Sequence, residues 1–155
     1  MSHLFEMGSR STGKARRSAG TELAGWTQEA LVAGDFRIRV ESDAVLIFET
    51  GTLDFATSAR AILCAIEEAK AHDIKCLLFD LREADLSNYY SYIVQHAETA
   101  AQAGLNPDYS IAVVGSRDRA DVLAFVEMVA RNRGWRARKF HDPDEARQWL
   151  RAGGG

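Results

Sequence analysis

The chain has 155 residues, of which 46% are apolar and 26% charged, and this predicts one globular domain with a continuous core. Its net charge is −3, and an acidic domain suits the phosphate backbone of nucleic acids poorly, so we expect no nucleic-acid partner. No apolar run reaches the roughly 20 residues that cross a bilayer, and the N-terminus lacks the apolar centre of a signal peptide. We therefore expect no integral membrane segment and a cytoplasmic location.

The first 34 residues differ in composition from the rest. Residues 1–25 carry four basic side chains against two acidic ones and are rich in Gly, Ser and Thr, which predicts a disordered basic tail. Residues 26–34 begin with Trp26, a side chain that is costly to leave in water, so we expect a docking arm there, helical or extended. We expect the arm to cover apolar surface either on its own domain or across a two-fold interface. In the second case the protein would be a homodimer.

We expect the folded domain over residues 35–152. Apolar alternation, buried apolar runs and helical spacing give these elements in chain order: strands over 36–40 and 45–48, a helix over 57–72, a strand over 74–79, a helix over 89–104, a strand over 109–114, a helix over 119–133, a strand over 135–140 and a helix opened by Asp142 and Pro143. The order ββαβαβαβα predicts an α/β fold with a mainly parallel sheet, an antiparallel opening hairpin and helices packed against it. Trp149 is expected to be a core anchor of the last helix.

Residues 48–91 show the most informative pattern. A strand runs into G-T-L-D, where Gly51 is expected to permit a sharp exit, and a helix follows. The buried segment K-C-L-L-F-D-L-R is expected to end as a strand at Asp80–Arg82 and leads to E-A-D-L-S-N-Y-Y-S. Over residues 35–151 the chain resembles the STAS domain, the fold of the anti-sigma-factor antagonists. Its closing segment, R-A-R-K-F-H-D-P-D-E-A-R-Q-W-L, is similar to the SpoIIAA-like (STAS/SEC14-type) bacterial proteins.

The resemblance implies a non-catalytic regulatory or binding module that acts through protein–protein contact. It also leaves open an alternative, a carrier or sensor of a small apolar or lipid-like ligand held between the first and second helices. The switch serine motif of the antagonists falls on Asn88, Tyr89, Tyr90 and Ser91, and its Asp-Ser-Ser-Gly pattern is absent. Ser87 and Ser91 flank the position, and either could be modified. The alternative is that Ser87 or Asn88 is the N-cap of the second helix and Ser91 a residue of its first turn.

These considerations define a candidate surface for a partner or ligand at the carboxyl ends of two strands and the start of the second helix. Its residues are Asp54, Asp80, Arg82, Ser87, Asn88, Tyr89, Tyr90, Ser91, Tyr92 and His96. Since residues one and three apart on a helix point differently, at least one of the three tyrosines should face solvent.

Other chemistry finds little support in the sequence. No Cys/His spacing typical of a metal site, no nucleophile motif and no Gly-rich phosphate loop occurs, so we expect no catalytic residue, no metal and no cofactor. Ser116 and Arg117 follow a strand and precede a helix, which makes them a weak candidate anion site. The alternative is a turn in which Ser116 or Asp118 caps that helix.

Overall fold

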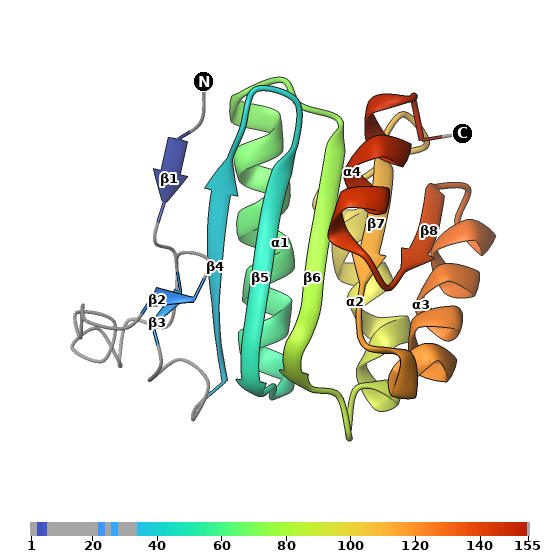
Figure 1. Cartoon of the computed structure of the whole chain (residues 1–155). Helices are drawn as coiled ribbons and strands as arrows, with labels where there is room; N and C mark the ends of the chain where they lie inside the picture. The colour runs from blue at the N-terminus through green and yellow to red at the C-terminus, as the bar shows by residue number, and fades with distance from the viewer. Residues whose placement is uncertain (1–2, 6–21, 24–25, 28–33, 155) are drawn as a thin grey trace.

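The computed structural model describes residues 3–5, 22–23, 26–27 and 34–154, and a six-stranded mixed sheet forms its centre (Figure 1). The strand order is β1-β4-β5-β6-β7-β8. The hairpin strands β4 (Asp35–Val40) and β5 (Val45–Thr52) are antiparallel, whereas β6 (Cys76–Asp85), β7 (Ser110–Val114) and β8 (Arg136–Phe140) continue the sheet parallel to β5. The predicted α/β class and the order ββαβαβαβα over residues 35–151 are confirmed.

The helices cover the two faces of this sheet unequally. Helices α1 (Phe55–Ala71), α2 (Tyr90–Gln102) and α3 (Ala120–Asn132) connect parallel neighbours and pack on one face, where they enclose the larger core. Helix α4 (Pro143–Arg151) crosses the other face over β6, β7 and β8 and encloses a smaller core (Figure 1). Three right-handed crossovers in the same direction along a sheet necessarily place their helices on one side. Among the described residues no helix combines the length and the apolar character that a membrane span requires.

Two short segments of the predicted tail lie in strands, while the disorder predicted for the tail as a whole stays a prediction. β1 (His3–Phe5) pairs antiparallel with β4, and β2 (Glu22–Leu23) pairs with β3 (Trp26–Thr27), although residues 1–25 were predicted to lack structure. An uncovered edge strand presents a row of free N–H and C=O groups, and at β4 these groups pair with β1. The remainder of the tail and most of the docking arm lie outside the described residues.

β6 extends further than the sequence indicates. Its predicted end was the Asp80–Arg82 segment, but β5 continues to Thr52 and pairs Thr50 and Thr52 with Glu83 and Asp85. A register shift between Phe48 and Thr50 accommodates the extension. Gly51, expected to permit a sharp exit from the strand, instead lies inside β5 with a positive φ of 75°.

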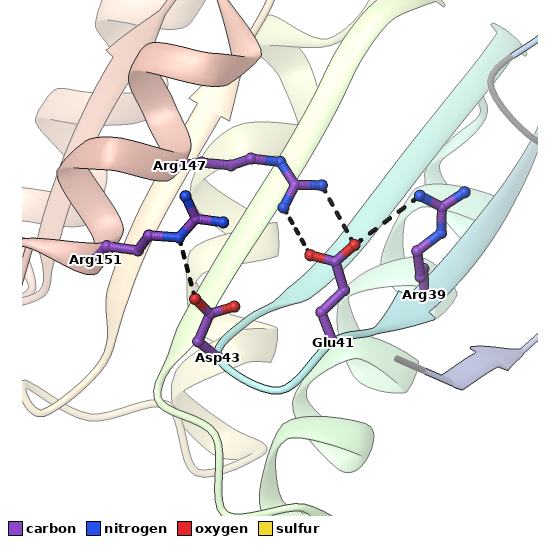
Figure 2. A network of polar contacts seen from close by, with 5 residues as sticks. All are labelled: Arg39, Glu41, Asp43, Arg147 and Arg151. Carbon is purple, nitrogen blue, oxygen red and sulfur yellow. Dashed lines mark hydrogen bonds and ion pairs between the residues drawn. The ribbon is translucent and has the colours of Figure 1, made fainter. Parts of the chain in front are cut away.

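Ion pairs fasten α4 to the hairpin turn (Figure 2). Arg147 binds Glu41 through Nη1–Oε1 at 2.6 Å and Nη2–Oε2 at 3.4 Å, and Arg39 reaches the same carboxylate at 4.0 Å. The Arg151 Nε–Asp43 Oδ2 distance is 3.2 Å. Pairs this exposed contribute about 0–1 kcal/mol each, so they orient α4 more than they stabilise it.

Buried side chains attach α4 to the sheet. Ala146 and Leu150 are buried against β6, β7 and β8, while Trp149 is only half-buried, with its ring 5.7 Å from that of Phe140. The prediction of Trp149 as the core anchor is therefore wrong, because it lies at the margin of the smaller core and Leu150 occupies the buried position.

Candidate functional site

The structure distributes the predicted surface over both faces of the sheet. Asp80 and Arg82 lie on the face that carries α4, where Arg82 Nε and Nη2 donate to the two carboxylate oxygens of Asp80 at 2.9 and 2.7 Å. The backbone N–H of Arg82 also donates to Asp80 Oδ1 at 3.1 Å. The opposite face receives Tyr92 and His96 from α2 and Tyr89 from the position just before this helix. The sheet thus separates residues that the sequence suggested would share one surface.

Ser87 and Asn88 are exposed in the connection between β6 and α2. The backbone N–H and hydroxyl of Ser87 both donate to Asp85 Oδ1, at 3.0 and 2.5 Å, and the Ser91 hydroxyl donates to the carbonyl of Asn88 at 2.7 Å. These bonds lower the pKa of Asp85. Helix α2 begins at Tyr90 with no side-chain cap, so the expected capping by Ser87 or Asn88 is wrong. Their bonds form the connecting turn instead, and modification of Ser87 or Ser91 stays a prediction.

Asp54 is the N-cap of helix α1. Its Oδ1 accepts the backbone N–H of Thr57 at 2.7 Å, which caps α1 and lowers the pKa of the carboxyl. Because the bond holds the carboxylate against its own helix, Asp54 contributes to the start of α1 in this structure.

The candidate anion site lies beside a carboxylate. Ser116 precedes the short 3₁₀ segment η4 (Arg117–Arg119), and its hydroxyl donates to Asp118 Oδ1 at 2.5 Å. Arg117 is exposed. A negative charge at this distance from Ser116 opposes an anion, and the site stays a prediction that the geometry does not strengthen.

A buried polar pair joins α1 to α2. The Nε2 atom of His96, a residue only 5% exposed, lies 2.6 Å from Oγ of the fully buried Ser58. The Ser58 hydroxyl also lies 3.1 Å from the carbonyl of Asp54. The other ring nitrogen of His96, Nδ1, is buried and has no hydrogen-bond partner in the described part of the chain. Burial lowers the pKa of His96 to about 4, so the imidazole is neutral near pH 7.

Aromatic rings surround this imidazole. Phe55 stacks on His96 with a centroid distance of 5.0 Å and an interplanar angle of 21°. The rings of Tyr89 and Tyr92 lie 5.7 and 5.8 Å from it. Tyr89 and Tyr92 therefore pack around the histidine, while Tyr90 is 44% exposed, which confirms that one of the three tyrosines faces solvent.

Glu49 is a further buried polar residue on the same side of the sheet. Neither carboxyl oxygen has a hydrogen-bond partner among the described residues, and the side chain is fully buried. Burial raises its pKa to about 8, so Glu49 is protonated and neutral near pH 7. The pKa of Tyr89 is raised well above its ordinary value by burial and, secondarily, by the nearby Glu49.

Neither Glu49 nor Ser58 was identified from the sequence, although one signal pointed to each. Alternation along β5 places Glu49 on the same face as Val45 and Ile47, which are core residues. Helical spacing likewise places Ser58 one turn before the buried Ile62. At such buried positions a carboxyl must be neutral or paired with a cation, and a hydroxyl must be hydrogen-bonded, which makes both residues unusual.

A cavity of about 90 Å³ adjoins His96. It lies between α2, α3 and the sheet, with one contribution from α1, whereas the predicted ligand position was between the first and second helices. Ten of its thirteen lining side chains are aliphatic or phenylalanine; the other three are Tyr89, His96 and Trp135. Its volume falls well below the roughly 300 Å³ at which pockets for drug-sized ligands begin.

A larger hollow of about 240 Å³ lies on the α4 face. Half of its lining residues are charged: Arg39, Asp80, Arg82, Asp144 and Arg147. The lining makes it unsuited to the apolar ligand that the resemblance implied.

The outer surface of α2 and α3 carries a cluster that we call the α2–α3 patch, formed by Tyr90, Val94, Phe125 and Met128. Val94 and Met128 are 57% and 49% exposed, and the Tyr90 ring contacts the half-buried Phe125 at 5.4 Å between centroids. Near the C-terminal ends of the same helices, Arg133 Nη2 and Glu98 Oε1 form an ion pair at 2.6 Å. Large exposed apolar side chains from neighbouring elements are typical of interaction surfaces.

Comparison with known proteins leaves the family unassigned: no protein-family model and no curated protein matches this chain. Within the described residues, no group of three or more His, Cys, Asp or Glu side chains could hold a metal ion.

Proposed function

We propose that this chain is a non-catalytic binding module that contacts another protein through the α2–α3 patch. The observation that carries the proposal is the exposure of Tyr90, Val94 and Met128, three large apolar side chains on two adjacent helices. Their burial by a partner would be favourable at roughly 25 cal/mol for each Å² of apolar surface removed from water. The resemblance to STAS domains supports the same class of function, and we propose STAS-like regulation without the antagonists' switch serine.

The patch is best suited to an amphipathic helix of the partner. Tyr90 and Val94 are one turn apart on α2, and Phe125 and Met128 are one turn apart on α3. Two rows with this spacing match the i, i+3, i+4 positions of an apolar helix face.

Photo-crosslinking in cells that contain the chain, followed by affinity measurements with purified components, tests this proposal. A photoreactive amino acid at Val94 should capture a partner, whereas the same group at Gln148, exposed on α4, should not. The captured protein is then purified, and its Kd is measured with the unmodified chain, with Val94→Glu and with Met128→Glu. Because both side chains are about half exposed, these variants should fold normally and weaken binding by about tenfold or more.

Two results would contradict the proposal. Equal affinity of the unmodified chain and both variants would show that the α2–α3 patch is not the interface. Capture of only a second copy of this chain, with self-association lost in Val94→Glu, would identify a homodimer surface in place of a regulatory one. A Gln148→Glu variant serves as the matched control for added charge.

A further inference from the structure

Side chains of α3 bind the outer edge of β8. This strand ends the strand order, and none of the described strands pairs with its outer side (Figure 1). A bare edge presents unpaired N–H and C=O groups and invites pairing with another chain. At the opposite end of the sheet, β1 pairs with β4. A strand therefore covers one edge of the sheet, and helix side chains meet the other.

Alternation along β8 decides which backbone groups face outward. The carbonyl of Phe140 accepts the N–H of Gly115, the residue after β7, at 3.0 Å, so Phe140 directs its carbonyl toward the sheet. Since successive residues of a strand direct their polar groups to opposite sides, Ala137 and Lys139 direct theirs to the free edge. An added strand would bind these outward groups.

Glu127 and Arg131 of α3 take the place of such a strand. The N–H of Lys139 donates to Glu127 Oε2 at 2.9 Å, and Arg131 Nε donates to the carbonyl of Ala137 at 2.9 Å. Glu127 and Arg131 are one turn apart on the helix, with Arg131 Nη2 3.6 Å from Glu127 Oε2. In a parallel pair, one residue of the added strand would donate to the Ala137 carbonyl and accept from the Lys139 N–H. The guanidinium and the carboxylate supply the same donor and acceptor.

Two further features of β8 act in the same direction. Arg136 and Arg138 are exposed and Lys139 is half-buried, so a second copy of β8 placed alongside would bring like charges together. Basic side chains on an edge strand are a common protection against pairing. Just before the strand, the N–H of Trp135 donates to the carbonyl of Ala130 in α3 at 3.2 Å, which covers the start of the edge.

We infer that the Glu127–Arg131 pair closes the β8 edge and keeps it from adding a strand of a second copy of this chain. An exposed ion pair with this spacing stabilises a helix only weakly, so the bonds to β8 distinguish these two residues from an ordinary surface pair. The closure operates whether or not the α2–α3 patch binds a partner.

Amide hydrogen exchange of the full-length, ¹⁵N-labelled chain tests the closure at one atom. In the unmodified chain the Lys139 amide should be protected, and Glu127→Ala should raise its exchange rate about tenfold, as expected for the loss of one hydrogen bond to a charged group. Glu127→Gln keeps an acceptor oxygen and should retain the protection. Glu98→Ala, which breaks an exposed ion pair with Arg133, is the control and should change nothing at Lys139. An unprotected Lys139 amide in the unmodified chain would overturn the inference.

Sedimentation velocity tests the consequence for association. The double variant Glu127→Ala/Arg131→Ala should sediment faster than the unmodified chain as concentration rises, in about 0.5 M NaCl, where repulsion between the basic strands is largely screened. Adding Lys139→Pro removes the N–H that a new strand needs and should restore the sedimentation of the unmodified chain, whereas association through the α2–α3 patch would persist. A double variant that sediments as the unmodified chain does at every concentration, or association that survives Lys139→Pro, would refute the closure. If the double variant fails to fold, exchange at Lys139 in the unmodified chain still decides.

Discussion

Replacing Glu49 by glutamine should abolish the loss of stability that we expect as pH rises above 6.5. In the folded chain the pKa of Glu49 is about 8, whereas its ordinary value is 4.5. The unfolded chain therefore releases this proton first, and the folded state loses free energy relative to it as pH rises from 4.5 to 8. Each pH unit in this window costs about 1.4 kcal/mol, so the free energy of unfolding should fall by about 2 kcal/mol between pH 6.5 and pH 8.

His96 acts with the opposite sign in a lower window. Its folded pKa of about 4 lies below the ordinary 6.5, so its contribution is complete above pH 6.5 and is lost as pH falls toward 4. Between pH 4.5 and 6.5 the unfolded chain has given up a proton at Glu49 and holds one at His96, and the two slopes cancel. We therefore expect a stability plateau from pH 4.5 to 6.5, followed by a decline. In Glu49→Gln the plateau should become a rise with pH, and the decline should disappear.

Urea unfolding followed by tryptophan fluorescence measures these slopes, since Trp135 is buried. The difference between the unmodified chain and Glu49→Gln at each pH removes the contributions of all other groups. Glu98→Gln is the control, because that carboxylate is exposed and its pKa is lowered by its bond to Arg133. Its difference curve should be flat above pH 6.5. If the Glu49→Gln difference were equally flat, Glu49 would be solvated or paired with a cation, and the description of a neutral buried carboxyl would be refuted.

The remaining predictions concern stability. Asp54→Ala removes the cap of α1 and should lower the free energy of unfolding by about 1 kcal/mol, measured by urea unfolding, whereas Asp54→Asn should retain most of it. Leu150→Ala should cost about 2–5 kcal/mol, because Leu150 is buried in the smaller core. Trp149→Ala should cost clearly less than Leu150→Ala in the same assay, since Trp149 is half-buried. The reverse order would show that Trp149 anchors α4 after all.

The architecture could be predicted well from the sequence, because the periodicity of apolar residues reflects which side chains are buried. The alternation of Phe36, Ile38 and Val40 identified β4, and the apolar run before Asp80 identified a central strand. Predictions of strand ends from single turn-forming residues were less accurate. Gly51 was expected to end β5, but pairing with β6 continued past it, since tertiary hydrogen bonds override a single residue's preference.

The site was less predictable because it depends on pairs of residues that are distant in sequence. Ser58 and His96 are 38 positions apart, and their bond exists only because α1 and α2 lie side by side on the sheet. An ion pair such as Arg82–Asp80 neutralises a carboxylate that the sequence alone presents as an uncompensated negative charge. Asp80 was included in a binding surface as an acid at a strand end, but its charge is compensated two residues away.

Stability alone does not explain Glu49 and His96, whose unpaired atoms would cost less as apolar groups of similar shape. Helix α2 separates the interior from the outer surface, because Ala97 faces the cavity while Val94 faces solvent. The buried polar residues and the α2–α3 patch can therefore be perturbed separately. Val94→Glu should weaken binding of the partner and leave the pH dependence of stability unchanged, whereas Glu49→Gln should alter that pH dependence and leave the partner's Kd unchanged. If Glu49→Gln also changes the partner's Kd, the buried carboxyl is coupled to the outer surface, and by reciprocity binding of the partner must shift the pKa of Glu49.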